Sequence, residues 1–273
     1  MRRIAVLHME VMMKRAVTLL AVGSAVILIG SPAWAGQPLE TESTHMLGKG
    51  RFELEAGFEH QRSGDGTETA TPLAIEYGIT NRLELLVEPV PYNRIHDTRA
   101  VSQSGFGDVE VTATMLLREG RKGSPSLALA GEVKVPTAKN LRIGSGETDY
   151  SVYVIGGKRS GRWDTQVNLG YTVVGAPSGV QVNNMENFAV SEEFQWKERW
   201  QLVGEVFGHT AAQSTGEGTA TPGVPGTTEI GGAEIVGTLG ARYLSLDGLA
   251  YSIGLSLDNN AAFLIHPGIT LRW

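Results

Sequence analysis

The strongest constraint on the fold is an apolar residue at every second position, repeated in separate segments along most of the chain. In residues 51–61, Phe52, Leu54, Ala56 and Phe58 fall on one face, and mostly charged residues alternate with them. Alternation with a period of two is typical of a β-strand with one apolar face, whereas a helix repeats every three or four residues. The predicted strands cover residues 51–61, 70–79, 82–92, 108–118, 125–136, 147–157, 162–175, 186–196, 200–210, 229–243, 249–257 and 261–273.

The connections between these segments favour one class of β protein. With the exception of the tight turn at 258–260, longer and shorter connections alternate along the chain. Outer-membrane barrels have this asymmetry, with short periplasmic turns at one end and long external loops at the other. A tilted strand needs about 9–11 residues to cross a bilayer, whereas strands of soluble sandwiches are usually about 5–6 residues long. The sequence therefore predicts an all-β, closed antiparallel up-and-down transmembrane β-barrel of about 12 strands over residues 51–273, rather than a soluble periplasmic sandwich.

The start of the chain predicts export. Lys14 and Arg15 precede an apolar run that is too short for a membrane-spanning helix, and the small-residue site Ala33-Trp34-Ala35 follows. This order is typical of a secretory signal peptide, here residues 1–35 with a true start at Met12 or Met13. Residues 36–50 are then expected to form a short periplasmic segment before the barrel.

The composition excludes several classes of partner and cofactor. Removing the leader leaves 19 basic and 28 acidic side chains, a balance that argues against a nucleic-acid partner. The chain has no cysteine, which excludes disulfides and thiolate metal sites. No cofactor and no metal site are expected, since no pair of histidines has metal-ligand spacing and acidic turns such as 258–260 are explained by turn geometry.

The charged faces of the predicted strands form the candidate site. A cylinder of twelve strands is too wide for side chains to fill, so these residues would line a lumen. Closure would pair the first strand with the last, and would place Arg272 and His266 on the same inner wall as Glu53. Two interpretations stay open: a selectivity field inside a pore, or a charge ladder that holds the seam and narrows the lumen. The predicted lumen-lining residues are Glu53, Glu55, Glu59, Glu110, Glu132, Lys134, Asp149, Arg162, Asp164, Glu205, His266 and Arg272.

The last strand carries a second signal. It ends on Trp273, preceded at alternate positions by Leu271, Ile269 and Ile265, and resembles the C-terminal signature that the β-barrel assembly machinery reads. Pro267 departs from this pattern where a tyrosine is common. Because proline removes a ladder donor, a bulge is expected there.

Longer stretches resemble one family. The segments "LGKGRFELEAGFEH", "PLAIEYGITNRLELLVEPVPY", "GFGDVEVTATMLL" and "GETDYSVYVIGGKRSGRWDTQVNLGYTVVG" are similar to the family named for a MetA pathway of phenol degradation. The resemblance covers residues 47–273. It implies an outer-membrane barrel of about twelve strands and a link to uptake of aromatic compounds.

These observations predict an outer-membrane channel or transporter of a Gram-negative bacterium for small, aromatic or hydrophobic solutes. Its expected partners are outer-membrane lipid, the assembly machinery, periplasmic chaperones and the solute. The alternatives are a barrel enzyme acting on envelope lipids and a non-conducting structural or adhesive barrel, and a lumen plugged by residues 36–50 would favour either of them. An enzyme is not expected, because neither His60 with Ser63 nor His209 with Ser214 has the spacing of a nucleophile and its base.

Overall fold

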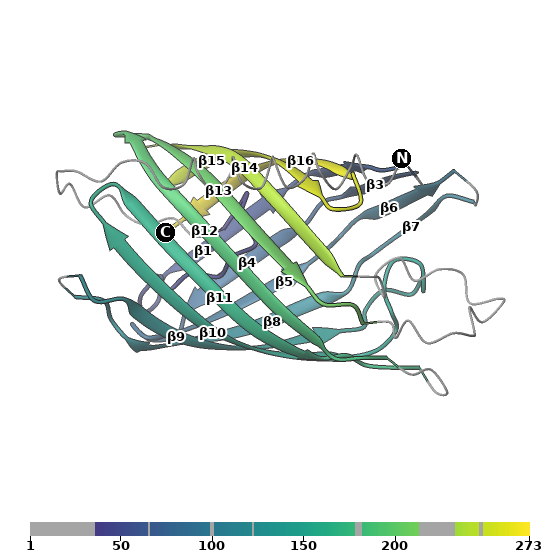
Figure 1. The fold of residues 1–273 in the computed structure, drawn as a ribbon, viewed down its shortest axis with the longest axis horizontal. Coiled ribbons are helices and arrows are strands. Elements are labelled where there is room, and N and C mark those ends of the chain that lie inside the picture. Colours follow the sequence, from purple (N-terminus) through teal and green to yellow (C-terminus); the bar gives the residue numbers. More distant parts are fainter. Residues whose placement is uncertain are drawn as a thin grey trace, which may run out of the picture. The chain divides into compact units, whose positions relative to one another are not determined.

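The computed structural model describes residues 36–64, 66–98, 101–121, 123–177, 182–212, 233–245 and 248–273. The predicted signal peptide lies outside these ranges. In the described part of the chain, no helix is long and apolar enough to span a membrane. Its strand segments all belong to one antiparallel sheet (Figure 1).

The sheet contains sixteen strand segments. They are β1 (Phe52–Gly57), β2 (Glu59–Arg62), β3 (Gly66–Ala70), β4 (Leu73–Gly78), β5 (Leu83–Pro89), β6 (Asn93–Asp97), β7 (Gln103–Gly105), β8 (Val109–Arg118), β9 (Ser126–Val135), β10 (Asp149–Ser160), β11 (Trp163–Val173), β12 (Met185–Lys197), β13 (Trp200–His209), β14 (Glu234–Leu244), β15 (Leu249–Asp258) and β16 (Phe263–Arg272).

These segments make twelve barrel strands, because each of the first four barrel strands is interrupted once. The breaks fall at Phe58, at residues 71–72, at 90–92 and at 106–108. The halves on either side of each break continue the pairing with the same neighbours, as in β1–β4 and β2–β3. From β9 onward every barrel strand is one uninterrupted segment. The predicted count of twelve is confirmed.

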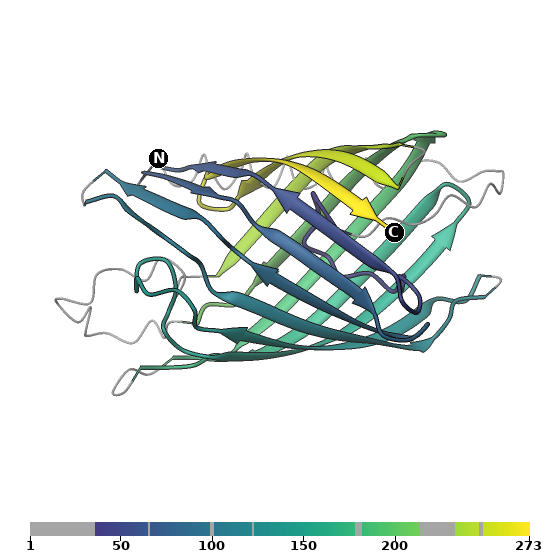
Figure 2. The same ribbon diagram turned by 180° about the vertical axis from the view of Figure 1, so that it is seen from behind.

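Pairing of the first and last strands closes the barrel. β1 lies antiparallel to β16, with Glu53 opposite Arg272 and Gly57 opposite Gly268. Figure 2 shows the two strands side by side, β1 in purple and β16 in yellow. A closed cylinder leaves no unpaired sheet edge, so the predicted closed antiparallel topology is also confirmed.

The predicted bulge at Pro267 is wrong. β16 is continuous from Phe263 to Arg272, and its register with β15 does not shift at the proline. The Pro267 carbonyl accepts a hydrogen bond from Phe58 N at 3.0 Å. Since N–H and C=O of one residue point to the same neighbour in an antiparallel ladder, the missing donor is lost opposite Phe58, where β1 and β2 separate.

The two faces of the barrel differ as the alternation predicts. On β15, Tyr251, Ile253, Leu255 and Leu257 are about half exposed, whereas Ser252 and Ser256, which alternate with them, are buried. A contiguous apolar band of this kind marks a surface that contacts a membrane or a partner. The inner face carries the polar and charged side chains.

Aromatic rings gather at the end of the barrel with the short turns. Phe52 lies 4.4 Å from Tyr77 and 5.8 Å from Trp273 between ring centroids. Trp163 packs on Phe194 at 4.5 Å and Trp200 on Tyr243 at 5.1 Å. Trp273 also exchanges two backbone hydrogen bonds with Phe52, each of 3.0 Å. Aromatic girdles of this type flank the apolar band of membrane barrels.

Candidate functional site

The interior of the barrel contains the segment of residues 36–47, here called the plug. Its main anchor is Glu205 on β13, whose carboxylate accepts hydrogen bonds from Thr41 N at 2.6 Å and from Glu40 N at 3.1 Å. The Thr41 hydroxyl donates to the same carboxylate. One buried side chain therefore binds two consecutive backbone amides, because an extended segment without a strand partner leaves its own N–H groups unsatisfied.

Further wall residues hold the plug on both sides of this anchor. Arg242 on β14 donates to the carbonyls of Gln37, at 2.7 Å, and Gly36, and pairs with Glu193 at 2.8 Å. Gln166 on β11 accepts from Thr44 N at 3.1 Å. Together with Glu205, these contacts attach the plug to β11, β13 and β14.

The C-terminal part of the plug joins a charged cluster on β11. His45 Nε2 lies 2.8 Å from Asp164 Oδ2, which also pairs with Arg159 at 2.6 Å. Leu47 N then donates to Glu84 on β5 at 3.1 Å. The plug thus crosses the interior from β14 to β5.

The sequence predicts a short periplasmic segment for residues 36–50, and the structure holds residues 36–47 of it against inward-facing side chains of the barrel wall. The segment has no alternating pattern that would place it in a strand. Its contacts are with side chains of barrel strands, from Glu84 to Glu205, the latter more than 100 positions away in the sequence, so local sequence carried no signal for its place.

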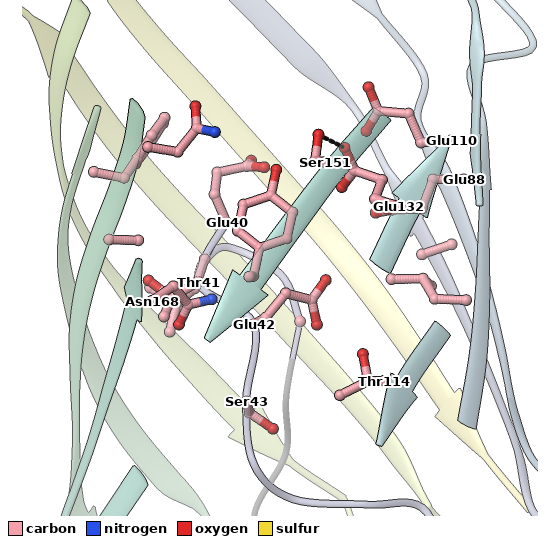
Figure 3. A pocket seen from close by; sticks show the side chains of 18 of the residues that line it. Glu40, Thr41, Glu42, Ser43, Glu88, Glu110, Thr114, Glu132, Ser151 and Asn168 are labelled. Atoms are coloured by element: carbon pink, nitrogen blue, oxygen red, sulfur yellow. Dashed lines mark hydrogen bonds between the residues drawn. The ribbon is translucent and has the colours of Figure 1, made fainter. Parts of the chain in front are cut away.

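A cavity of about 390 Å³ lies beside the plug, lined by plug residues and by residues of β1, β4, β5 and β8 to β13. Figure 3 shows Glu40 and Glu42 of the plug in the middle of this space, with Glu88, Glu110 and Glu132 on the wall facing them. The acidic wall, as we call the carboxylates that the barrel strands contribute to this lining, consists of Glu53, Glu55, Glu76, Glu84, Glu88, Glu110, Glu132 and Asp149.

The cavity is lined by many carboxyl groups and by few basic side chains. Lys134 is among its lining residues, but its ammonium lies 2.6 Å from Asp149, which offsets that positive charge. Glu132 accepts a hydrogen bond from Ser151 at 3.1 Å. Enclosure inside the barrel, with Glu84 and Glu132 nearby, raises the pKa of Glu42 in the plug to about 8. When its carboxyl groups are ionised, such a chamber attracts cations and disfavours anions.

The structure brings together half of the residues predicted to line the lumen. The six that line the cavity are Glu53, Glu55, Glu110, Glu132, Lys134 and Asp149.

The other predicted residues lie elsewhere. Glu205 and Asp164 hold the plug, and Arg272 pairs with Glu53 at 2.5 Å across the seam. His266 is buried on β16 and Glu59 is half-buried on β2. Arg162 was predicted to line the lumen, but it lies in the exposed turn between β10 and β11. The reason is that β11 begins at Trp163, one residue later than the alternation suggested.

Sequence reasoning missed several members of the site. Glu76, Glu84 and Glu88 alternate with the apolar residues of their strands, so the same parity rule could have found them. Glu40 and Glu42 carry no such signal, since the plug is not a strand.

Among the described residues of the interior, one serine–histidine pair is relevant to the enzyme alternative. Ser256 Oγ lies 2.8 Å from His266 Nε2, but Nδ1 of this histidine has no hydrogen-bond partner among the described residues. A serine nucleophile needs a base that a third group orients. The histidines that the sequence singled out are engaged otherwise, His60 with Thr69 at 2.9 Å and His209 with Glu234 at 3.6 Å.

The described residues contain no group of three or more side chains suited to a metal ion. In the turn 258–260, Asp258 accepts from the backbone amides of Asn260 and Ala262, at 2.8 and 2.7 Å. These contacts give that turn its shape.

Solved structures share the fold. The NanC porin superposes with a TM-score of 0.56 at 10% identity, over 80% of this chain and 98% of that one. The KdgM porin in complex with disordered oligogalacturonate gives 0.53, with the same identity and coverage. A second KdgM porin structure gives 0.52. Both are outer-membrane porins, and at this identity the likeness shows the barrel architecture.

Sequence comparison assigns the family. No curated protein matches the chain significantly. The family model described as "Putative MetA-pathway of phenol degradation" matches residues 35–233, most of the barrel, as the resemblance of the sequence segments predicted. The protein therefore belongs to the "Putative MetA-pathway of phenol degradation" family.

Proposed function

We propose that this protein is an outer-membrane channel for the passive passage of small solutes, closed by its own N-terminal segment. The observation that carries the proposal is the cavity between the plug and the acidic wall, inside a closed barrel with an apolar outer band. Its volume of about 390 Å³ lies within the usual range of small-molecule sites, about 300–1,000 Å³.

The orientation follows from the aromatic residues and the loops. Outer-membrane barrels keep their short turns on the periplasmic side, so the end with Trp273 would face the periplasm. The C-terminal residues Ile265, Ile269, Leu271 and Trp273 would then act as the assembly signal. We also place the assembly machinery and periplasmic chaperones among its partners on this basis.

The charge of the wall suggests the class of solute. Rings of carboxylates favour cations and neutral molecules over anions. The acidic wall would therefore repel a polyanion such as the oligogalacturonate of the KdgM complex. A neutral or cationic solute, including an uncharged aromatic compound as the family name suggests, fits this chamber better.

The plug gives a specific reason to keep a second candidate, a non-conducting structural barrel. Its anchors are mostly hydrogen bonds and ion pairs with polar walls, and its buried aliphatic side chains are Pro38 and Leu39. Contacts of this kind exchange with water at modest net cost. We therefore favour a plug that can leave the lumen over a permanent filling.

Planar-bilayer recordings distinguish a channel with a releasable plug from a non-conducting structural barrel. The full chain should show rare openings, and a variant lacking residues 37–47 should conduct steadily with a preference for cations. This deletion retains Gly36 after the predicted cleavage site. If the deletion variant is folded, as judged by heat-modifiable migration on gels, and yet does not conduct, the channel proposal is wrong and the structural barrel is favoured.

A further inference from the structure

The outward face of the barrel changes character beyond the breaks in the first barrel strands. On the first of these strands the outward residues are Phe52, Leu54, Ala56 and Phe58, and then His60 and Arg62. The parity is fixed by β16, where Ile265 lies opposite His60 and Phe263 opposite Arg62. The apolar band therefore ends at Phe58, and cationic side chains follow on the same face.

The neighbouring strands extend this cationic surface. Thr69 on β3 lies opposite His60, and Arg94 on β6 lies opposite Thr69. One row further from the apolar band, Thr67 lies between Arg62 and His96. Directly opposite residues share one face of a sheet. The six side chains therefore form an outward-facing grid, the outer cationic cluster, made of His60, Arg62, Thr67, Thr69, Arg94 and His96.

Acidic residues are kept off this face. The carboxylates of β2, β3, β6 and β7 are Glu59, Glu68 and Asp97, and their parity points all three toward the interior. Asn93, buried on the inner face, donates to Glu68 at 2.7 Å. Strand parity thus separates the charges, with anions inside and cations outside.

The outer cationic cluster is shaped to hold a ligand. A surface pocket of about 340 Å³ is lined by His60, Thr67, Thr69, Arg94 and His96. Nδ1 of His60 contacts the Thr69 hydroxyl at 2.9 Å, which fixes the imidazole beside the pocket.

The arginines remain available. Among the described residues, neither Arg62 nor Arg94 makes a hydrogen bond or ion pair through its side chain, and both are exposed. Neighbouring strands lie about 4.8 Å apart. An anion over the β3 threonines is therefore within reach of side chains from both flanking strands.

We propose that the outer cationic cluster binds the phosphate groups of the glycolipid that forms the outer leaflet around the barrel. Arginine guanidinium groups match phosphate oxygens in a bidentate geometry, and hydroxyl groups complete the shell. The position favours a lipid over a soluble ligand, because the cluster lies outside the barrel and borders the lipid-facing Phe58 and Phe263. The inference rests on the proposed membrane location and orientation, and it does not depend on conduction.

Native mass spectrometry of the full chain in detergent micelles tests this inference. The probes are lipid A with both phosphates and the same lipid A after removal of its phosphates. The wild type should retain the phosphorylated lipid and lose the other. The double variant R62Q/R94Q should bind the phosphorylated lipid at least about tenfold more weakly.

The matched control is R51Q/R82Q, which removes two exposed arginines at the short-turn end and should leave binding unchanged. Equal binding of both lipids by the wild type, or undiminished binding by R62Q/R94Q, would overturn the proposal. Inorganic phosphate that binds as tightly as the lipid would point to a free-anion site instead, and would also overturn it. Conductance of R62Q/R94Q should match the wild type, so a failure here stays separate from a failure of the channel proposal.

Discussion

The two sides of the barrel interior carry similar residue types and have different roles. On β11, β13 and β14, charged and amide side chains such as Gln166, Glu205 and Arg242 bind the plug directly. On β4, β5 and β8, the carboxylates of Glu76, Glu88 and Glu110 face an open cavity. The difference shows that an inward-facing charge can have one of two roles. It anchors a segment of the chain where backbone amides or carbonyls lie next to it, and it contributes to the electrostatic potential of the lumen where it faces a cavity.

Removing the main anchor should have the largest effect. Glu205→Ala deletes three hydrogen bonds to one carboxylate, which should weaken plug binding by about 3 kcal/mol and raise the unplugged fraction roughly a hundredfold. Labelling of Ser43→Cys, a buried plug position in a chain without other cysteines, measures release. Glu186→Ala, on the exposed outer face, is the control. Equal labelling of both variants would mean that Glu205 does not hold the plug.

Breaking the seam should affect stability rather than the plug. Arg272→Ala leaves the buried Glu53 carboxylate without its partner at 2.5 Å, which should cost about 2 kcal/mol, less than for a fully buried pair because the arginine is partly exposed. The temperature of the folded-to-unfolded shift on gels should fall, and Arg51→Ala should not lower it. A smaller loss in E53Q/R272A would show that the orphaned carboxylate causes the effect.

The plug should also respond to pH. Since enclosure raises the pKa of Glu42 from 4.5 to about 8, the plugged state binds a proton that the released state does not. Plug binding is therefore strongest at low pH and weakens as pH rises toward 8. Labelling of Ser43→Cys, corrected for the reactivity of a free thiol, should increase at least about tenfold between pH 6 and pH 8. Enclosure also raises the pKa of Glu40 to about 8, so Glu42→Gln should reduce this dependence and E40Q/E42Q should flatten it. An unchanged slope in Glu42→Gln would exclude Glu42 as a source.

Neutralising part of the acidic wall should have the smallest effect. In the chain lacking residues 37–47, Glu110→Gln with Glu132→Gln should lower the ratio of cation to anion permeability several-fold. The reversal potential in a salt gradient measures this ratio. Glu119→Gln with Glu198→Gln removes the same charge from exposed turns and should leave the potential unchanged. If both pairs behave alike, the wall does not select by charge.

Parity explains how much of this site could be predicted. A strand side chain points inward or outward according to its position alone, so Glu53 and Arg272 were expected on one inner wall and form an ion pair there. The same rule placed Arg162 inside, and it failed because that residue lies just outside the strand. Pro267 was expected to distort β16, but the barrel tolerates the missing donor by interrupting the ladder at Phe58.

The closed twelve-stranded barrel follows from the amino-acid pattern alone, since period-two alternation and alternating connection lengths leave few other folds for strands of this length. The position of residues 36–47 in the interior, beside a cavity lined by carboxylates, became visible in the folded structure. The physical reason is that alternation encodes the face of a residue within its own strand. The plug is held by side chains of several strands, from Glu55 and Glu84 to Glu205 and Arg242, and no local pattern records these contacts.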